Sequence, residues 1–261
     1  MKDRNRRNTA IIIGITAIFL FVVSWSLIAA YVNSPYLPEP QRVFATLISI
    51  LIQDEKDFSG FRISQHISAS MIRVFSGFGI AAVMAIPIGL LTGRFWHIEK
   101  AASPIVEIIR PIPPLAWIPF AIYFFRDPWS SVFIVAIGAI FPILLSTAAG
   151  VKSIDSVFVD AARTLGAKRL DVFRKVIIPA SVPSIMTGLR IGLGVGWMCV
   201  VAAELVGVKN GGLGVYIMLM SDVGRFENVF AGMIIIGFLG FVMVTIMTYV
   251  ERRLSRWAGM T

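Results

Sequence analysis

The chain has 261 residues, of which 57% are hydrophobic and only 15% are charged, with a formal net charge of +9. Soluble domains carry about 25% charged residues, and an aqueous fold of this size could not bury so many apolar side chains. Runs of roughly 20 apolar residues would instead cross a bilayer several times. The composition therefore excludes a soluble globule and predicts an all-α membrane protein. A single cysteine excludes an internal disulfide, and two distant histidines argue against a metal site.

Six apolar runs predict six transmembrane helices in one domain that covers residues 1–261. The runs are residues 10–32, 67–92, 102–125, 129–150, 182–206 and 229–250. The first run could also be a cleaved signal peptide. It exceeds the usual apolar core of about 7–15 residues, however, and its removal would leave five crossings and one terminus on the wrong side for its charges.

The basic residues predict the orientation in the membrane. Lys2, Arg4, Arg6 and Arg7 precede the first run, which places the N-terminus in the cytoplasm, and six crossings return the C-terminus to the same side. With this topology the inside segments carry a net charge of +9 and the outside segments −1. The cytoplasmic loops thus account for the basic excess, and no stripe is left over for nucleic acid.

Two outer segments are apolar but too short to cross. Residues 41–53 place Val43, Leu47 and Ile50 at helical spacing, which predicts a short helix at the outer surface. Residues 211–214 form a glycine-rich turn before the apolar stretch 215–220. This stretch could be a plain interfacial loop, could dip into the outer mouth, or could receive a partner protein.

The connection at residues 151–181 is far more polar than the other inside segments. Val157, Ala161 and Leu165 predict one short helix with a narrow apolar strip, and Gly166 permits a turn. A second apolar strip predicts a second short helix, which two prolines are expected to end. Its strip is Leu170, Phe173 and Ile177, and the prolines are Pro179 and Pro183. The pattern predicts a helix-turn-helix that either docks a partner or lies against the membrane surface.

The same loop resembles a known motif. Asp160, Ala161 and Ala162, followed by Gly166 and by the segment 176–179 that ends at Pro179, resemble the EAA loop of permease subunits in binding-protein-dependent ABC importers. Asp160 stands where Glu is usual, and Ile178 where Leu is usual. The segments 37–40, 104–119, 187–197 and 202–205 extend the resemblance over nearly the whole chain. They are similar to the taurine, aliphatic sulfonate and nitrate branch, and to its taurine permeases in particular.

The resemblance implies a non-catalytic permease dimer in the cytoplasmic membrane of a bacterium or archaeon. It implies two ATPase subunits that bind ATP and Mg and each receive one loop, and an extracytoplasmic binding protein that delivers a small anion such as taurine, an alkyl sulfonate or nitrate. Asp160 and Arg163 would be polar contacts to the ATPase, Ala161 and Ala162 would allow close approach, and Gly166 would make the turn. The chain itself lacks a G-x-x-x-x-G-K-[ST] phosphate loop, so we expect it to hold no cofactor.

Ionisable residues within the apolar runs are costly and usually face the protein interior. The candidates are Arg73, Glu107, Arg110, Arg190 and Glu204. Arg73 and Arg190 lie near span ends, where snorkelling is a sufficient explanation, and Glu204 has no partner close in sequence. One hypothesis is that Arg110, with Trp117 and Trp197 in the pathway wall, lets a small anion pass, while Glu107 and Glu204 hold the gate closed by pairing. The alternative is a Glu107–Arg110 ion pair that braces a helix interrupted by prolines.

Gly188, Gly192 and Gly196 recur every four residues, which lets helix backbones approach closely in lipid. This stripe could pack within one subunit or between two.

The sequence leaves two other classes of protein to consider. An ion-gradient-driven secondary carrier would also have six spans and intramembrane charges, but it would need no projecting loop. A membrane enzyme is disfavoured, because the chain has no His or Cys constellation, no clustered carboxylate pair and no G-x-S-x-G motif.

Overall fold

The computed structural model describes residues 2–207 and 210–257, and this part of the chain is helical apart from loops and one isolated bridge between Lys56 and Arg62. Side chains at 2–8, 10–11, 207 and 255–257 are also outside the description. The orientation argument from Lys2, Arg4, Arg6 and Arg7 therefore rests on the sequence alone.

The chain divides into two compact units. The first takes the N-terminal part up to Ser64 together with Tyr216–Ile235, and the second takes Gln65–Val215 together with the chain from Ile236 onward. This division groups residues by their contacts and does not test whether the chain forms a single transmembrane domain, which stays a prediction from the sequence.

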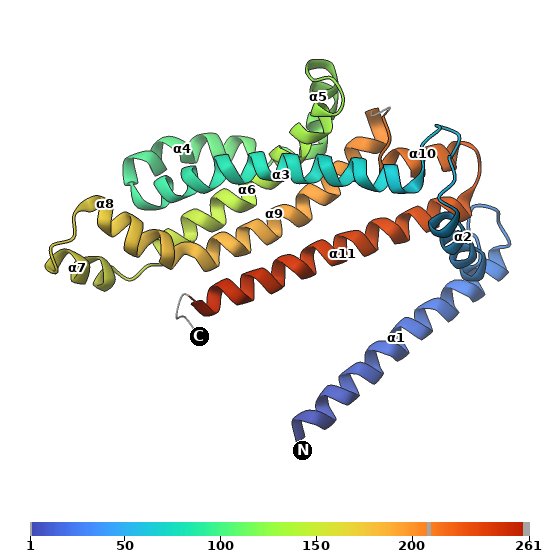
Figure 1. Ribbon diagram of the computed structural model, residues 1–261, viewed down its shortest axis with the longest axis horizontal. Coiled ribbons are helices and arrows are strands. Elements are labelled where there is room, and N and C mark those ends of the chain that lie inside the picture. The colour runs from blue at the N-terminus through green and yellow to red at the C-terminus, as the bar shows by residue number, and fades with distance from the viewer. Residues whose placement is uncertain (1, 208–209, 258–261) are drawn as a thin grey trace. The chain divides into compact units, whose positions relative to one another are not determined.

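The first unit contains two helices of its own and parts of two more (Figure 1). They are α1 (Lys2–Val32), α2 (Pro40–Gln53), most of α10 (Leu213–Asp222) and the start of α11 (Phe226–Trp257). The proline at the first turn of α2 is compatible with a helix start, because its missing N–H would be unpaired there anyway. The predicted surface helix is thus present, with Val43 fully buried and Phe44 exposed.

The second unit is a bundle of long helices with a bent segment and a projecting loop (Figure 1). Its elements are α3 (Ile63–Arg94), α4 (Trp96–Ile109), a 3-10 turn η1 (Pro114–Trp117), α5 (Ile118–Phe124), α6 (Trp129–Lys152), α7 (Ser156–Thr164), α8 (Arg169–Val172), a π turn η2 (Phe173–Ile177), α9 (Ile178–Gly207) and the later part of α11. We call the end that carries α7 and α8 the loop end.

Within the described residues, five helices are long and apolar enough to cross a membrane. The remaining predicted span, the run at residues 102–125, is broken. There α4 and the η1–α5 segment meet at a bend of 81°. Pro111 and Pro113 lie in the break, where they cannot donate backbone hydrogen bonds, and Pro114 begins the next turn. The prediction that prolines interrupt this run is confirmed, and the count is five helices, or six if the bent pair is one span.

Helix α6 packs closely against α3 and α9 through glycines. A Cβ atom on Gly77 of α3 would lie 2.6 Å from the carbonyl oxygen of Val132, and one on Gly89 would lie 2.7 Å from Thr147 Cβ. A Cβ on Gly192 of α9 would lie 2.8 Å from Ile143 Cγ1. Such distances leave no room for any larger residue.

The glycine stripe of α9 faces α6 of the same chain along its length. A Cβ on Gly188 would lie 2.8 Å from Ser146 Cβ, and one on Gly196 would lie 3.1 Å from Val135 Cγ1. Of the two arrangements that the sequence left open, packing within one subunit is the one that this geometry matches.

A pair of alanine substitutions tests this packing. We expect Gly192→Ala to lower the free energy of unfolding by about 1–3 kcal/mol, the usual cost of overpacking. The added methyl group would collide with Ile143 and with the Ala139 carbonyl. Gly194→Ala is the matched control on the same helix, since its Cβ would meet only Val244 Cγ2 at 3.8 Å. Thermal unfolding of the purified protein in lipid nanodiscs distinguishes the two, and equal stability would contradict the α6–α9 interface.

Candidate functional site

The loop 151–181 begins with α7, which is capped at both ends. The Asp155 side chain accepts a hydrogen bond from the Val157 N–H at 3.0 Å, which satisfies a free donor of the first turn. At the other end Gly166 has φ +82°, its N–H donates to the Arg163 carbonyl, and the Ala167 N–H donates to the Ala162 carbonyl. This is a Schellman motif, and its left-handed residue favours glycine. Gly166 therefore makes the turn that the sequence predicts.

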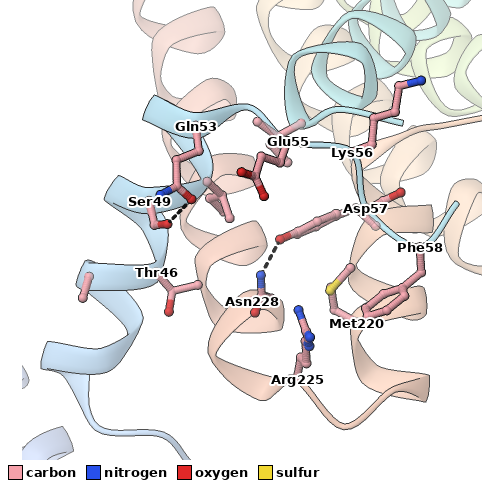
Figure 2. A pocket seen from close by; sticks show the side chains of 14 residues that line it. Thr46, Ser49, Gln53, Glu55, Lys56, Asp57, Phe58, Met220, Arg225 and Asn228 are labelled. Carbon is pink, nitrogen blue, oxygen red and sulfur yellow. Dashed lines mark hydrogen bonds between the residues drawn. The ribbon is translucent and has the colours of Figure 1, made fainter. Parts of the chain in front are cut away.

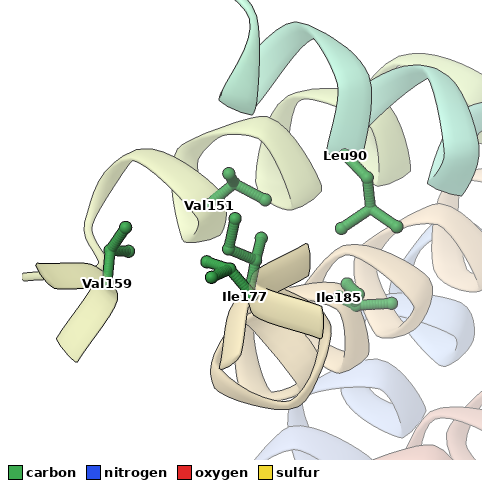
Figure 3. Close-up of a cluster of buried hydrophobic side chains, with 6 residues drawn as sticks. Leu90, Val151, Val159, Ile177 and Ile185 are labelled. Carbon is green, nitrogen blue, oxygen red and sulfur yellow. The ribbon is translucent and has the colours of Figure 1, made fainter. Parts of the chain in front are cut away.

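A cluster of buried side chains attaches this loop to the bundle. The cluster contains residues from the loop and from three long helices (Figure 3). The loop contributes Val159, Val172 and Ile177, and the long helices contribute Leu90 of α3, Val151 of α6 and Ile185 of α9. The cluster therefore packs α7 against three long helices, α3, α6 and α9.

The predicted apolar strip of α7 lies on the exposed side instead of the packed side. Val157 is 64% exposed and Leu165 is 88% exposed, and Phe158 beside them is equally open. Asp160 and Arg163 are exposed on the same helix, 3.5 Å apart. Ala161 is exposed, whereas Ala162 packs against the anchoring cluster. In this motif Asp160, Ala161 and Arg163 are thus exposed to solvent, whereas Ala162 packs α7 against the bundle.

The expectation that Pro179 and Pro183 end the second helix is wrong. The helix continues from Arg169 to Gly207 through the π turn at Phe173–Ile177, where the Ile178 N–H donates to the Phe173 carbonyl. A proline ring clashes with the carbonyl four residues earlier, and a wider turn relieves that clash. Pro179 lies two residues after the π turn, and the second helix of the loop forms one continuous helix with the span.

Arg110 occupies the break in the bent span. It lines two hollows of about 420 Å³ each, one bounded by α4 and α6 with Glu107 and Lys152, the other by α6 and α9. Glu107 and Arg110 are both exposed, and neither forms an ion pair or a side-chain hydrogen bond with any described residue. The bracing ion pair that the sequence left as an alternative is therefore not formed in the described structure.

The two tryptophans differ in their surroundings. Trp117 is half-buried and packs beside Ile118 and Cys199, near the bend. Trp197 is buried, and its indole N–H donates to the Ile236 carbonyl at 3.2 Å, with Gly240 in close contact. Neither ring lines the hollows at Arg110, and Trp197 serves to hold α9 against α11.

A buried ionic cluster joins α3 to α9 at the end opposite the loop. Arg73 Nη1 donates to Glu204 Oε1 at 3.0 Å, and both side chains are almost wholly buried. Ser70 Oγ donates to the same carboxylate, as does the Gly214 N–H at 3.0 Å. Snorkelling of Arg73 is wrong, because its side chain is buried in an ion pair. Glu204 has no partner close in sequence, as predicted, and its partner lies 131 residues away.

The same cluster holds the glycine-rich turn before α10. Arg73 Nη1 also donates to the Gly211 carbonyl at 2.6 Å, and the Gly212 N–H donates to His66 Nδ1 at 2.9 Å. A Cβ on Gly212 would lie 2.5 Å from Glu204 Cδ. Glycine is required here because the carboxylate occupies the space of a side chain. We call these residues the outer clamp: His66, Ser70, Arg73, Glu204 and Gly211–Gly214.

The first unit has a pocket of about 700 Å³ between α2, the loop 54–63, α10 and the start of α11 (Figure 2). Its polar lining mixes both signs of charge, with Glu55 and Lys56 on the loop and Arg225 over the Phe58 ring at 4.9 Å. Asn228 Nδ2 donates to the Tyr216 hydroxyl at 3.0 Å on one wall. The pocket is too mixed in character to identify a ligand.

Comparison with known proteins decides the class. Residues 85–256 match the family described as binding-protein-dependent transport system inner membrane component. The chain belongs to this family. It is therefore a multi-pass inner-membrane permease subunit of an ABC importer, a class of subunit that is typically non-catalytic.

Relatives of known name cover almost the whole permease. A putative ABC transporter permease of Methanocaldococcus jannaschii is 43% identical, over 92% of this chain and 90% of that protein. The taurine transport permease of Escherichia coli is 36% identical, over 97% and 91%. A nitrate import permease of Synechocystis is 31% identical, over 90% and 86%.

Solved structures show the same fold. The MetNI methionine ABC transporter in an inward-facing conformation matches with a TM-score of 0.61 at 20% identity, over 75% of this chain and 95% of that one. An amino acid ABC transporter solved with histidines matches with a TM-score of 0.58 at 24% identity, over 74% and 92%.

The outer clamp yields a double-mutant prediction. We expect Arg73→Met alone to cost about 3–5 kcal/mol, because it leaves the buried Glu204 carboxylate without its cation. Glu204→Met alone should cost less, because Arg73 keeps Asp127 at 3.3 Å. The double variant should cost clearly less than the sum. The control is the partly exposed pair Lys152–Glu99 at 2.9 Å, where the same substitutions should cost about 1 kcal/mol or less. Thermal unfolding measures all of these, and additive effects at Arg73 and Glu204 would contradict the clamp.

Proposed function

We propose that two copies of this permease form the pathway of an importer for a small anion, such as taurine, an alkyl sulfonate or nitrate. In this proposal each loop 151–181 lies in the cytoplasm and seats in a groove of one ATPase subunit, and the two ATPases bind ATP and Mg. A binding protein delivers the substrate from outside and supplies most of the selectivity.

The observation that carries the proposal is the exposed face of α7. Val157, Phe158 and Leu165 leave an apolar surface open to solvent, with Asp160 and Arg163 beside it. Exposed apolar side chains rimmed by charges are typical of a protein contact. The buried cluster of Figure 3 then gives a means of transmission, because motion of α7 in an ATPase groove must be passed to α3, α6 and α9.

Loss of the ATPase tests the loop assignment. We expect Asp160→Arg to reduce the amount of a phosphate-loop ATPase that co-purifies with the tagged permease by about tenfold or more, since a reversed charge in an interface costs several kcal/mol. Asp160 is exposed and contacts only Arg163 among the described side chains, so the fold should survive. Arg253→Glu, an exposed reversal on α11, is the control. Recovery of the ATPase with Asp160→Arg at the level of the unaltered permease would contradict the loop assignment.

Arg110 is the residue we assign to the anion pathway. Its guanidinium faces two hollows at a break in the span and has no described acidic partner, which leaves its charge available to a passing anion. Glu107 lies in the same hollow and would oppose anion entry unless Arg110 offsets it. Trp117 lies near the bend and stays a candidate for the pathway wall. Trp197 is better explained by its packing between α9 and α11, and Glu204 by the outer clamp.

A pair of arginine variants separates pathway from structure. We expect Arg110→Gln to lower anion uptake at least about tenfold with little change in thermal stability, because no ion pair is lost. Arg110→Lys should restore part of the uptake. Arg190→Gln is the contrast, since Arg190 lies 2.7 Å from Glu251 and its loss should lower stability. Uptake by proteoliposomes is the measurement, and normal uptake by Arg110→Gln would remove Arg110 from the pathway.

A further inference from the structure

A large hollow at the loop end has a strongly one-sided charge. It has a volume of about 1100 Å³ and lies between the α3–α4 connection and the segment 163–173. The lining includes four basic residues and no acidic one. The basic residues are Arg94, Arg163, Lys168 and Arg169. Such a concentration of like charge attracts an anion.

Most of these cations are not neutralised within the chain. Arg163 lies 3.5 Å from Asp160, but Arg94, Lys168 and Arg169 form no ion pair with any described residue. The nearby Asp171 does not line the hollow and is paired with Lys175 at 3.4 Å. Within the described part of the chain, three of the positive charges in the hollow therefore have no ion-pair partner.

Apolar side chains lie beside the cations. Leu91 and Phe95 from the α3–α4 connection and Leu170 from α8 line the same hollow, and all three are substantially exposed. A ligand that covers this surface needs apolar groups next to its negative charge, which a free inorganic anion does not have.

The position of the hollow indicates the level of the membrane interface. Arg94 is the last residue of the spanning helix α3, and Trp96, 62% exposed, follows it at the start of α4 with Lys100 over its ring. Trp and basic residues at the end of an apolar helix are typical of the headgroup region. In Figure 1, α7 extends beyond this turn, so the hollow lies between the apolar part of the bundle and the surface that we assign to the ATPase.

We propose that this hollow binds the headgroup of an anionic phospholipid from the leaflet on the loop side. Guanidinium groups of Arg94 and Arg169 and the ammonium of Lys168 meet the phosphate oxygens, and the acyl chains lie over Leu91, Phe95 and Leu170. The lipid then ties the end of α3 to the segment that follows α7. The assignment of the leaflet rests on the orientation in the proposed function, but binding itself does not.

Lipid binding can be measured on the purified complex by native mass spectrometry during titration with phosphatidylglycerol, with phosphatidylcholine as the uncharged comparison. We expect the unaltered protein to retain phosphatidylglycerol selectively. The variant Arg94→Gln/Lys168→Gln/Arg169→Gln should lower the apparent affinity by about tenfold or more, because each basic residue near the surface adds to binding of an anionic lipid.

Matched variants make the outcome decisive. The control Arg174→Gln/Arg252→Gln/Arg253→Gln removes three exposed cations that do not line the hollow and should bind as the unaltered protein does. Equal retention by the first variant, or equal loss in the control, overturns the proposal. Should the triple variant fail to fold, the single variants Lys168→Gln and Arg169→Gln at exposed positions give the same comparison with smaller shifts.

The ATPase is a separate readout in the same samples. If the triple variant loses the ATPase but keeps phosphatidylglycerol, the cations face the ATPase and the lipid proposal is wrong, while the proposed function stands. If no ATPase accompanies even the unaltered chain, the proposed function fails, and the lipid titration of the chain alone still decides the lipid site.

Discussion

Close approach of helix backbones in lipid is the constraint on which the rest of this structure depends. Apolar side chains gain nothing by leaving lipid for protein, so association must come from van der Waals contact, and small residues allow the most of it. Glycines on α3 and α9 place both helices against α6 at distances that exclude a Cβ atom. Other interactions, including the clamp and the anchored loop, act on a bundle that this packing has already made rigid.

Each end of the bundle is fixed by a different means. At one end the outer clamp joins α3 and α9 through a buried ion pair, and the carboxylate of Glu204 organises the turn before α10. At the loop end, the cluster of Val151, Val159 and Ile177 joins α7 to the long helices, and α9 continues through its π turn into the loop. Between them the bent span leaves Arg110 open beside two hollows. Fixed ends would let the proposed motion of the loop pass through the bundle as a rigid-body movement.

The spans and the turn at Gly166 could be predicted from the sequence, because both depend on local signals. Apolar length defines a crossing, and a glycine after an amphipathic stretch defines a helix end. The pairing of Arg73 with Glu204 could not be predicted, since no local pattern brings together residues 131 positions apart. The signal that was available, three glycines at 211, 212 and 214 after an intramembrane carboxylate, indicates a turn but not what it encloses.

One expectation is wrong because it treats a helix in isolation. Pro179 and Pro183 are expected to end the second helix of the loop, but the π turn accommodates the proline. The sequence also leaves open whether the apolar strip of the first helix docks a partner or lies against the membrane. In the structure the buried face of α7 is the one with Val159 and Ala162, which leaves Val157 and Leu165 outside. Tertiary contacts, which no local pattern contains, decide both features.

Spin-label distances within one subunit test the central claim most directly, which is that α7 and α9 move as one rigid body. Cys199 is the single cysteine, so a Cys199→Ala background with Ser156→Cys at the start of α7 and Met198→Cys on α9, both exposed, gives two defined labels. In assembled transporter diluted with unlabelled copies, we expect one narrow distance distribution that ATP does not change. A broad distribution, or one that shifts when ATP is added, would show that the loop moves independently of the bundle and would contradict the account.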